Sequence, residues 1–559
     1  MANNYVFGAN LIENLTTGMY QNSLVIFREY IQNSCDAIDK ARPKILGTDE
    51  GTVEITIDAE NRRITIEDNG TGIPVLDFKS TLTSIAASDK SLDNDRGFRG
   101  IGRLCGLAYC KELRFISTAK DEGIKSTMIF DAAKLRSHFY ISEKLKAEDI
   151  LDAVISFKTT PADADEHFFR VEMIGINDTN SDLLDVVAVR DYLSFVAPVT
   201  YSANFYYEKL ITAHAAELKF KIAEYKILVN GEQVVKNYKT HFKTSRGDDD
   251  IFALEFRDFK DKAGNLIAWS WIGLSKFKGV LDETNGTPDN KMRGIRLRAG
   301  NIQIGNQDVF KNLFKEDRGT KYFIGEVHAV DKNLIPNGRR DYFIENAARN
   351  ILEGALEKYF VELYEMYHAA SDIRGFCKKI NAPAEAERDF QAGRSTLKNR
   401  AELDAELAKL NKTAAAAENK ISSMRQEAEQ NPESPLSRVV LRMTDNQSVI
   451  TPPPIHIQYR RINKNNFRQN IGRVKRKSFT SRLKTSYSTT QSLRATNSSI
   501  SWKRSLPNEP PRLADRAELQ EQIYSRQLDE TCDVFSERVQ RRREILQGRL
   551  ENFCLEVVA

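Results

Sequence analysis

The segment REYIQNSCDAID, residues 28–39, decides the fold of the N-terminal part of this chain. At about 100° per residue, Glu29, Asn33 and Asp36 fall on one face of a helix, and the apolar residues fall on the other. The pattern predicts an amphipathic helix that Pro43 ends. Its polar face either meets solvent or lines a pocket, and the helix by itself favours solvent.

The composition is that of a globular protein with a large core. The 559 residues are enough for three or four domains, with 41% apolar and 29% charged residues. No run approaches 18 apolar residues, and the N-terminus lacks the pattern of a signal peptide, so a cytoplasmic protein is expected. The six cysteines show no CxxC pair, which predicts reduced thiols and no zinc site.

Charge is distributed unevenly along the chain. Residues 446–508 contain 13 Lys and Arg and no Asp or Glu, so the remainder carries about −9 of the net +4. This stretch is rich in Ser, Thr and Asn, and is predicted to be disordered or loosely folded. Its basic side chains could contact phosphates, and Tyr459, Phe467 and Phe479 could stack on bases. It is therefore either a solvated linker or a nucleic-acid-binding region.

Strands and helices are expected to alternate after the first helix. Residues 52–67 are predicted to form two strands joined by a short turn, and residues 75–85 a helix. The charged stretch 86–100 is predicted to be a mobile loop, with another helix after Gly100. Three more strands are predicted, at 112–119, 125–131 and 167–176. These elements predict an α+β sandwich, assigned to residues 1–180.

A second α/β domain is predicted over residues 181–345, with a hairpin that turns at Asn230–Gly231 and two long helices over about 344–371. From Leu403 the apolar residues follow a 4-3 spacing for three heptads, which predicts a coiled coil or an antiparallel hairpin. The remaining regions are assigned as helical and coiled-coil (346–430), basic linker (431–513) and C-terminal helix (514–559).

Two glycine motifs change the interpretation of the polar helix face. DNGTGI places Asp68 at a strand end before Gly70 and Gly72, where the backbone can approach a flat ligand. GFRGIG, residues 97–102, enters a helix whose N–H groups could bind phosphate. Either motif alone is more often a turn. Their order and spacing after the first helix favour a nucleotide pocket.

These motifs resemble those of the GHKL, or Bergerat-fold, ATPases, which include gyrase, the ninety-kilodalton heat-shock chaperones, histidine kinases and MutL. REYIQNSCDAIDKA is similar to the first chaperone motif, and RGFRGIGRL is closer to the MutL form of the lid end. The resemblance covers residues 1 to about 180. It implies a Bergerat-fold α/β sandwich followed by a second α/β domain of βαβ type, with ATP and Mg²⁺ as ligands.

The resemblance also implies a role for each polar residue of the first motif. Glu29 would be the general base that polarises the attacking water. Asn33 would coordinate Mg²⁺ through its amide oxygen, and Asp68 would accept the adenine amino proton. Asp36 would either support the pocket or contact the nucleotide.

The glycines and one lysine are implied to shape the base pocket and the lid. Gly70 and Gly72 would let adenine lie against the backbone, and Lys90 would be either a phosphate contact or a solvated lid residue. Three further glycines would hold the lid and offer N–H groups to the phosphates: Gly97, Gly100 and Gly102. The family's Gly-Thr before the last strand is absent from DEHFFRVEM, so the rim of the base pocket is open to question.

A second, shorter resemblance concerns EVHAVDKNLIPNGRRDYF, residues 326–343. It looks like the chaperone middle-domain segment in which a loop carries an arginine to the γ-phosphate. The matching residue is Arg340, beside Arg339, and the alternative is a surface arginine pair.

The expected function is Mg-dependent ATP hydrolysis that drives a dimeric, chaperone-like conformational clamp acting on a protein partner. The alternative is an ATP-switched nucleic-acid-binding protein, MutL-like or part of genome (antiviral) defence. A complete topoisomerase is not expected, because no tyrosine-nucleophile domain is evident after residue 380. Kinase activity is not expected either, since no phosphoacceptor-histidine helix is evident.

Overall fold

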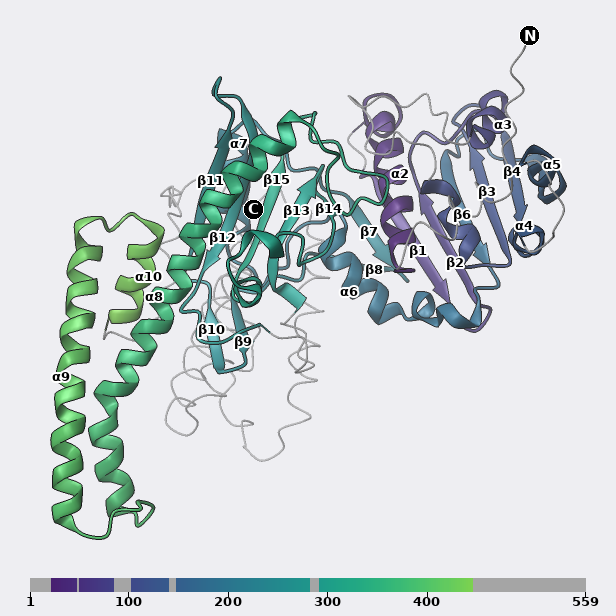
Figure 1. Ribbon diagram of the computed structural model, residues 1–559. Helices are drawn as coiled ribbons and strands as arrows, with labels where there is room; N and C mark the ends of the chain where they lie inside the picture. Colours follow the sequence, from purple (N-terminus) through teal and green to yellow (C-terminus); the bar gives the residue numbers. More distant parts are fainter. Residues whose placement is uncertain (1–21, 48–49, 85–101, 140–146, 282–290, 446–559) are drawn as a thin grey trace, which may run out of the picture. The chain divides into compact units, whose positions relative to one another are not determined.

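The computed structural model describes residues 22–47, 50–84, 102–139, 147–281 and 291–445 (Figure 1). Some predictions lie outside these ranges: those on Lys90, Gly97, Gly100, the basic segment 446–510 and the C-terminal helix 514–559. Within the described ranges the fold is α+β, as predicted, and two sheets form its framework.

The first sheet has eight strands in the order β5-β4-β3-β6-β2-β1-β7-β8, and is drawn from purple to blue in Figure 1. All neighbours are antiparallel except β1 and β7, which are parallel. The strands are β1 (Thr52–Asp58), β2 (Arg63–Asp68), β3 (Glu112–Thr118), β4 (Ile124–Asp131), β5 (Ile155–Pro161), β6 (Phe168–Ile174), β7 (Lys226–Val229) and β8 (Glu232–Gln233).

Helix α2 (Val25–Ala41) packs its apolar face on the core of this sheet. Phe27, Ile31 and Ile38 are at most 1% exposed, in the same cluster as Val53 and Ile64. The other helical segments of this part are α3 (Val75–Thr83), α4 (Ala132–Phe139), α5 (Ala147–Val154), a 3₁₀ segment (Asp178–Leu184), α6 (Val186–Val196) and α7 (Glu208–Glu217). Helices α4 and α5 were not predicted, because eight residues hold only about two helical turns, and strand β5 was not predicted, because six of its seven residues are exposed and it has no buried face.

The α-helix ends at Ala41, just before Pro43, as predicted, and the chain then continues as one π-helical turn, Arg42–Leu46. Proline fits at the start of this turn because its missing N–H has no acceptor to lose there. The helix predicted after Gly100 is a 3₁₀ helix, Gly102–Ala108. Two glycines in seven residues disfavour a regular α-helix.

The β7–β8 hairpin turns at Asn230–Gly231, as predicted, but it extends the first sheet through the pairing of β7 with β1. The first hydrophobic core accordingly reaches Val234. The domain boundary at residue 180 remains a prediction. The structure adds that part of the segment assigned to the second domain completes the first sheet.

The second sheet has five strands in the order β11-β12-β15-β13-β14, with β13 and β15 parallel. A small separate hairpin, β9 (His241–Thr244) and β10 (Gly247–Asp250), precedes it. The strands of the five-stranded sheet are β11 (Ala253–Lys260), β12 (Leu266–Leu274), β13 (Gly294–Ala299), β14 (Ile302–Ile304) and β15 (Ile324–Ala329). Short 3₁₀ turns lie at Lys311–Leu313 and Asp317–Lys321.

A single helix, α8 (Ala347–Gln391), replaces the two long helices that were predicted. Its apolar residues continue at spacings of three and four onto the core of the second sheet, so one helix suffices. Buried members are Leu352, Leu356, Tyr359, Phe360, Leu363, Met366 and Tyr367. No helix within the described ranges is long and apolar enough to cross a bilayer.

Helix α9 (Arg400–Gln430) runs back along α8, and α10 (Pro435–Thr444) follows. Arg400 pairs with Glu387 at 3.4 Å near the connecting turn, whereas Ala428 shares a core cluster with Ile373. The end of α8 thus contacts the start of α9, and an earlier part of α8 contacts the end of α9, so the two helices form an antiparallel hairpin. The structure thus has one of the two arrangements that the heptad spacing predicts.

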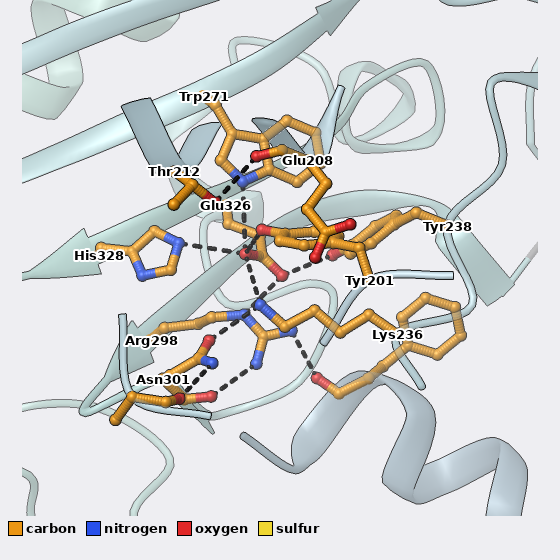
Figure 2. Close-up of polar contacts among 12 residues, drawn as sticks. Tyr201, Glu208, Thr212, Lys236, Tyr238, Trp271, Arg298, Asn301, Glu326 and His328 are labelled. Atoms are coloured by element: carbon orange, nitrogen blue, oxygen red, sulfur yellow. Dashed lines mark hydrogen bonds and ion pairs between the residues drawn. The ribbon is translucent and has the colours of Figure 1, made fainter. Parts of the chain in front are cut away.

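A buried charge cluster lies at the centre of the second sheet (Figure 2). The Glu326 carboxylate on β15 is fully buried, and six side chains from the surrounding elements point toward it in Figure 2. The donors are Arg298 Nε (2.5 Å), Tyr201 Oη (2.8 Å), Tyr238 Oη (3.1 Å), His328 Nε2 (3.1 Å), Lys236 Nζ (3.2 Å) and Trp271 Nε1 (3.3 Å). A buried carboxylate needs such partners, since leaving it unpaired is costly.

Burial and mutual charge shift the pKa values in this cluster. Burial alone would raise the pKa of Glu326, but Arg298 and Lys236 outweigh it and hold that pKa well below its usual range. Burial, reinforced by the charge of Arg298, lowers the pKa of Lys236 to about 7. Burial also lowers the pKa of His328 to about 4, so its ring is neutral at pH 7.

The His328 pKa predicts acid sensitivity of the fold. Between the folded pKa of about 4 and the unfolded value of 6.5, the unfolded chain binds more protons than the folded chain. The free energy of unfolding therefore falls as the pH drops through this window, by up to ~3 kcal/mol at about 1.4 kcal/mol per pKa unit. His328→Phe should lack this part of the slope, while a phenyl ring keeps the stacking on Trp269 (4.4 Å).

Urea unfolding of both proteins at several pH values from about 7 to about 4.5 measures the difference in slope. The other shifted groups change the free energy of unfolding outside this pH range: Glu326 does so below its ordinary pKa of 4.5, and Lys236 above its lowered pKa of about 7. Parallel pH profiles for the two proteins would contradict the assignment to His328.

Candidate functional site

The polar face of α2 is buried. Glu29 is 5% exposed and Asp36 is 3% exposed, whereas Asn33, one turn after Glu29, is half-buried. The solvent-exposed interpretation of this face is therefore wrong. Buried carboxylates require partners, and their identity defines the site.

The Glu29 carboxylate lies between two arginines and a glycine. Arg28 Nη2 is 3.4 Å from Oε1, and Arg340 Nε is 3.3 Å from Oε2. A Cβ placed on Gly102 would lie 2.7 Å from Oε2, so the backbone at the lid end passes directly over the carboxylate. The structure thus brings together Glu29, Gly102 and Arg340 from three distant parts of the sequence.

Arg340 lies in the loop between β15 and α8. Its backbone adopts φ +54°, and its carbonyl accepts the Gly305 N–H at 2.8 Å. The loop is closed by the Asn337 N–H, which donates to the Tyr342 carbonyl at 2.8 Å. Arg28 Nη2 donates to the Arg339 carbonyl at 3.1 Å. Arg340 thus reaches Glu29 with its side chain, and Arg339 is held by its backbone.

Asp68 ends β2 and is 2% exposed. The Gly70 N–H donates to Asp68 Oδ1 at 3.0 Å, and a Cβ on Gly70 would lie 2.6 Å from Ala37 Cβ on α2. Gly72 has φ +64°, and a Cβ there would lie 2.0 Å from the Thr118 carbonyl. Side chains at these two positions would collide with neighbouring segments, so the turn needs both glycines.

Two residues at this turn were not identified from the sequence. The Ser117 hydroxyl accepts the Ile73 N–H and donates to the Phe168 carbonyl, both at 2.8 Å, so it fixes the turn to β3 and β6. Phe169 pairs with both Asp68 and Ser117 in the sheet. The hydroxyl that fixes the glycine turn therefore comes from β3, and no sequence pattern pointed to it, because it depends on strand register.

Tyr30 ties the 3₁₀ helix Gly102–Ala108 to α2. Its hydroxyl donates to the Arg103 carbonyl at 3.0 Å and accepts the Gly106 N–H at 3.1 Å. Arg28 and Tyr30 flank Glu29 inside the opening motif, yet their partners lie far away in sequence. Lys90, Gly97 and Gly100 lie outside the described ranges.

The residues present fit a nucleotide with Mg²⁺. Glu29 and Asn33 offer a carboxylate and an amide oxygen one helical turn apart. The described residues hold no group of three or more His, Cys, Asp or Glu suited to a metal. Mg²⁺ needs no such group, since one or two protein oxygens, water and phosphates complete its coordination. Glycines at 70, 72 and 102 let the backbone pack closely against Ala37, the Thr118 carbonyl and the Glu29 carboxylate.

Comparison with known proteins agrees with this geometry. Residues 21–159 match the family model of histidine kinase-, DNA gyrase B- and HSP90-like ATPases. A chaperone protein HtpG of Rhizobium meliloti (strain 1021) is 36% identical over 87 residues, 14% of each chain. HtpG of Natranaerobius thermophilus is 34% identical over 129 residues, 20% of each chain.

A longer match extends beyond the family segment. HtpG of Orientia tsutsugamushi (strain Boryong) is 26% identical over 346 residues, 58% of this chain and 46% of the relative. The chain thus spans less than half the length of each of these relatives. The family match covers the part of the chain that holds Glu29 and Asp68.

Asp68→Asn should abolish ATP binding. The buried carboxylate is the only acidic group of the glycine turn, and a neutral amide cannot serve as the same acceptor for an adenine amino group. Titration calorimetry measures the affinity, and Glu54→Gln, on the exposed side of β1, serves as the control. Unchanged affinity in a folded Asp68→Asn protein would exclude the adenine role.

Proposed function

We propose that this GHKL-type ATPase domain binds ATP with Mg²⁺ and hydrolyses it to ADP and phosphate in a chaperone-like cycle. The observation that carries the proposal is the contact of Arg340 with the buried Glu29. This contact joins Glu29, the candidate base on α2, to an arginine more than 300 residues later in the sequence. Gly102 packs against the same carboxylate. An ion pair built only for stability would not need a motif glycine packed against its carboxylate.

Each residue of the site is assigned a part in the reaction. Glu29 orients the attacking water and accepts its proton. Asn33 binds Mg²⁺ through its amide oxygen, Asp68 accepts a hydrogen bond from the adenine amino group, and Asp36 supports the pocket from α2. Bound Mg²⁺ supplies charge neutralisation at the phosphates. Hydrolysis of this kind depends mostly on positioning and on the stabilisation of charge.

Arg340 would act on the terminal phosphate. In the described structure its guanidinium pairs with Glu29. When a nucleotide is present, we expect it to turn to the phosphate, which leaves the carboxylate available as a base and places a cation where negative charge develops. Arg339 contributes through the carbonyl that Arg28 holds.

The protein is proposed to act as a homodimer on a protein partner. The support is the likeness to relatives named chaperone protein HtpG. Light scattering with and without a non-hydrolysable ATP analogue tests dimerisation, and pull-down under the same two conditions tests for a partner. If the protein stays monomeric with and without the ATP analogue and no protein is pulled down in either condition, the dimeric clamp is excluded.

A second candidate function is an ATP-switched nucleic-acid binder, including a role in genome defence. It is favoured by the acid-free basic segment 446–508, which lies outside the described residues. Fluorescence anisotropy with labelled single- and double-stranded oligonucleotides at increasing salt tests it, since phosphate contacts weaken as salt rises. Absence of binding at low salt would leave the segment as a linker.

Glu29→Ala should retain ATP binding and lose hydrolysis. Removal of a general base typically lowers the rate by roughly 10²–10⁴. Calorimetry for affinity and phosphate release for turnover separate the two effects. Turnover close to that of the wild-type protein would refute the assignment.

Arg340→Ala should keep ATP affinity within about a factor of three while turnover falls by about tenfold to a hundredfold, because the cation acts on charge that develops during reaction. Arg339→Ala serves as the matched neighbour and should be milder, since its described contact is made by the backbone. Normal hydrolysis by Arg340→Ala would mean that the second sheet does not contribute to catalysis.

A further inference from the structure

We propose that Glu326 is a positioning residue for Arg340: its buried cluster fixes both the arginine loop and the helix beside Glu29, so that the two sides of the site stay in register. The inference rests on the proposed function. It is independent of the Arg340 contact itself, because Glu326 belongs to neither the arginine loop nor α2.

The cluster has no place for a substrate. Glu326, Arg298 and Lys236 are each 0% exposed, and the carboxylate is surrounded by six donors (Figure 2). Its partners also bond outward to backbone: Arg298 Nη2 donates to the Phe195 carbonyl at 2.8 Å. Such a closed network holds elements together and does not bind a ligand.

On one side the cluster holds two segments that reach Arg340. Strand β15 carries Glu326 and leads into the loop with Arg340. The β13–β14 hairpin carries Arg298 and ends at Gly305, whose N–H donates to the Arg340 carbonyl. A Cβ on Gly305 would lie 2.6 Å from the Asp341 carbonyl, so this contact is close-packed. The position of Arg340 thus depends on both segments, which Glu326 and Arg298 join.

On the other side the cluster holds the surroundings of Glu29. Phe195, whose carbonyl Arg298 binds, lies in α6. Val189 and Leu193 of α6 are fully buried in the same core cluster as Phe27 of α2, so α6 packs against the helix that carries Glu29. Helix α6 therefore connects the cluster with the Glu29 side of the site.

Further bonds join the cluster to the strand that pairs with β1. Lys236 Nζ donates to Asn301 Oδ1 at 2.8 Å, and Asn301 Nδ2 donates to the Ala223 carbonyl at 2.7 Å. Ala223 and Lys236 flank the β7–β8 hairpin, which belongs to the first sheet. The cluster is accordingly the place where the second sheet is bonded to the end of the first.

The test compares Glu326→Gln, which keeps shape and removes charge, with Arg340→Ala and the double variant. Glu326→Gln should keep ATP affinity within about threefold and lower turnover by about tenfold or more, with no further loss in the double variant, because both changes act through one group. Asp249→Asn is the control: its carboxylate is also buried, but it bonds to backbone N–H groups near Lys276 and Lys278.

Hydrogen exchange gives a readout independent of ATP turnover. Amides of the arginine loop, residues 335–344, and of Gly305 should exchange at least about tenfold faster in Glu326→Gln than in wild type or Asp249→Asn. If the wild-type protein hydrolyses no ATP while this exchange still rises, the proposed function fails and the positioning role stands.

Tyr238→Phe decides the question if Glu326→Gln does not fold, since it removes one donor to the same carboxylate (3.1 Å). It should give smaller changes in the same direction, about threefold in loop exchange and turnover. A folded variant with wild-type loop exchange, or additive losses in the double variant, would overturn the proposal.

Discussion

The parallel pairing of β1 with β7 is the constraint on which the rest of the described structure depends. It places a hairpin from the later part of the chain at the edge of the first sheet, in register from Thr52 and Lys226 onward. The segments on either side of that hairpin then enter the cluster around Glu326. This pairing and the direct contacts of Arg28 and Arg340 together fix the arginine loop relative to Glu29.

The candidate site is formed by close approach as much as by charge. Three glycines bring backbone against a carboxylate, against Ala37 and against the Thr118 carbonyl, at distances that no side chain would permit. Glu29 and Asp68 are both nearly inaccessible, so their charges are stabilised by fixed donors and cations, not by water. Fixed partners of this kind reduce the reorganisation needed during a reaction, and the Arg340 side chain is the part of the site that is proposed to move.

Local features were predictable from the sequence and long-range ones were not. The periodicities of α2, β1 and β2 and the turn at Asn230–Gly231 identified those elements, because each pattern is contained in a few residues. Arg340 was singled out only through a resemblance, and the structure places its guanidinium on Glu29. Ser117 and the Glu326 cluster were missed, since their partners are set by strand register and by segments up to 125 residues apart.

The length of α8 has a mechanical meaning. Its 45 residues span roughly 68 Å at about 1.5 Å per residue. Its buried residues end at Ile373, so the remainder, with α9 folded back along it, extends past the core of the second sheet. The hairpin is therefore a lever arm: the 18 residues of α8 after Ile373 span roughly 27 Å, so a rotation of about 5° at Ile373 moves the far end by ~2 Å. A small rearrangement of the core of the second sheet would thus be passed on as a displacement where α8 turns into α9.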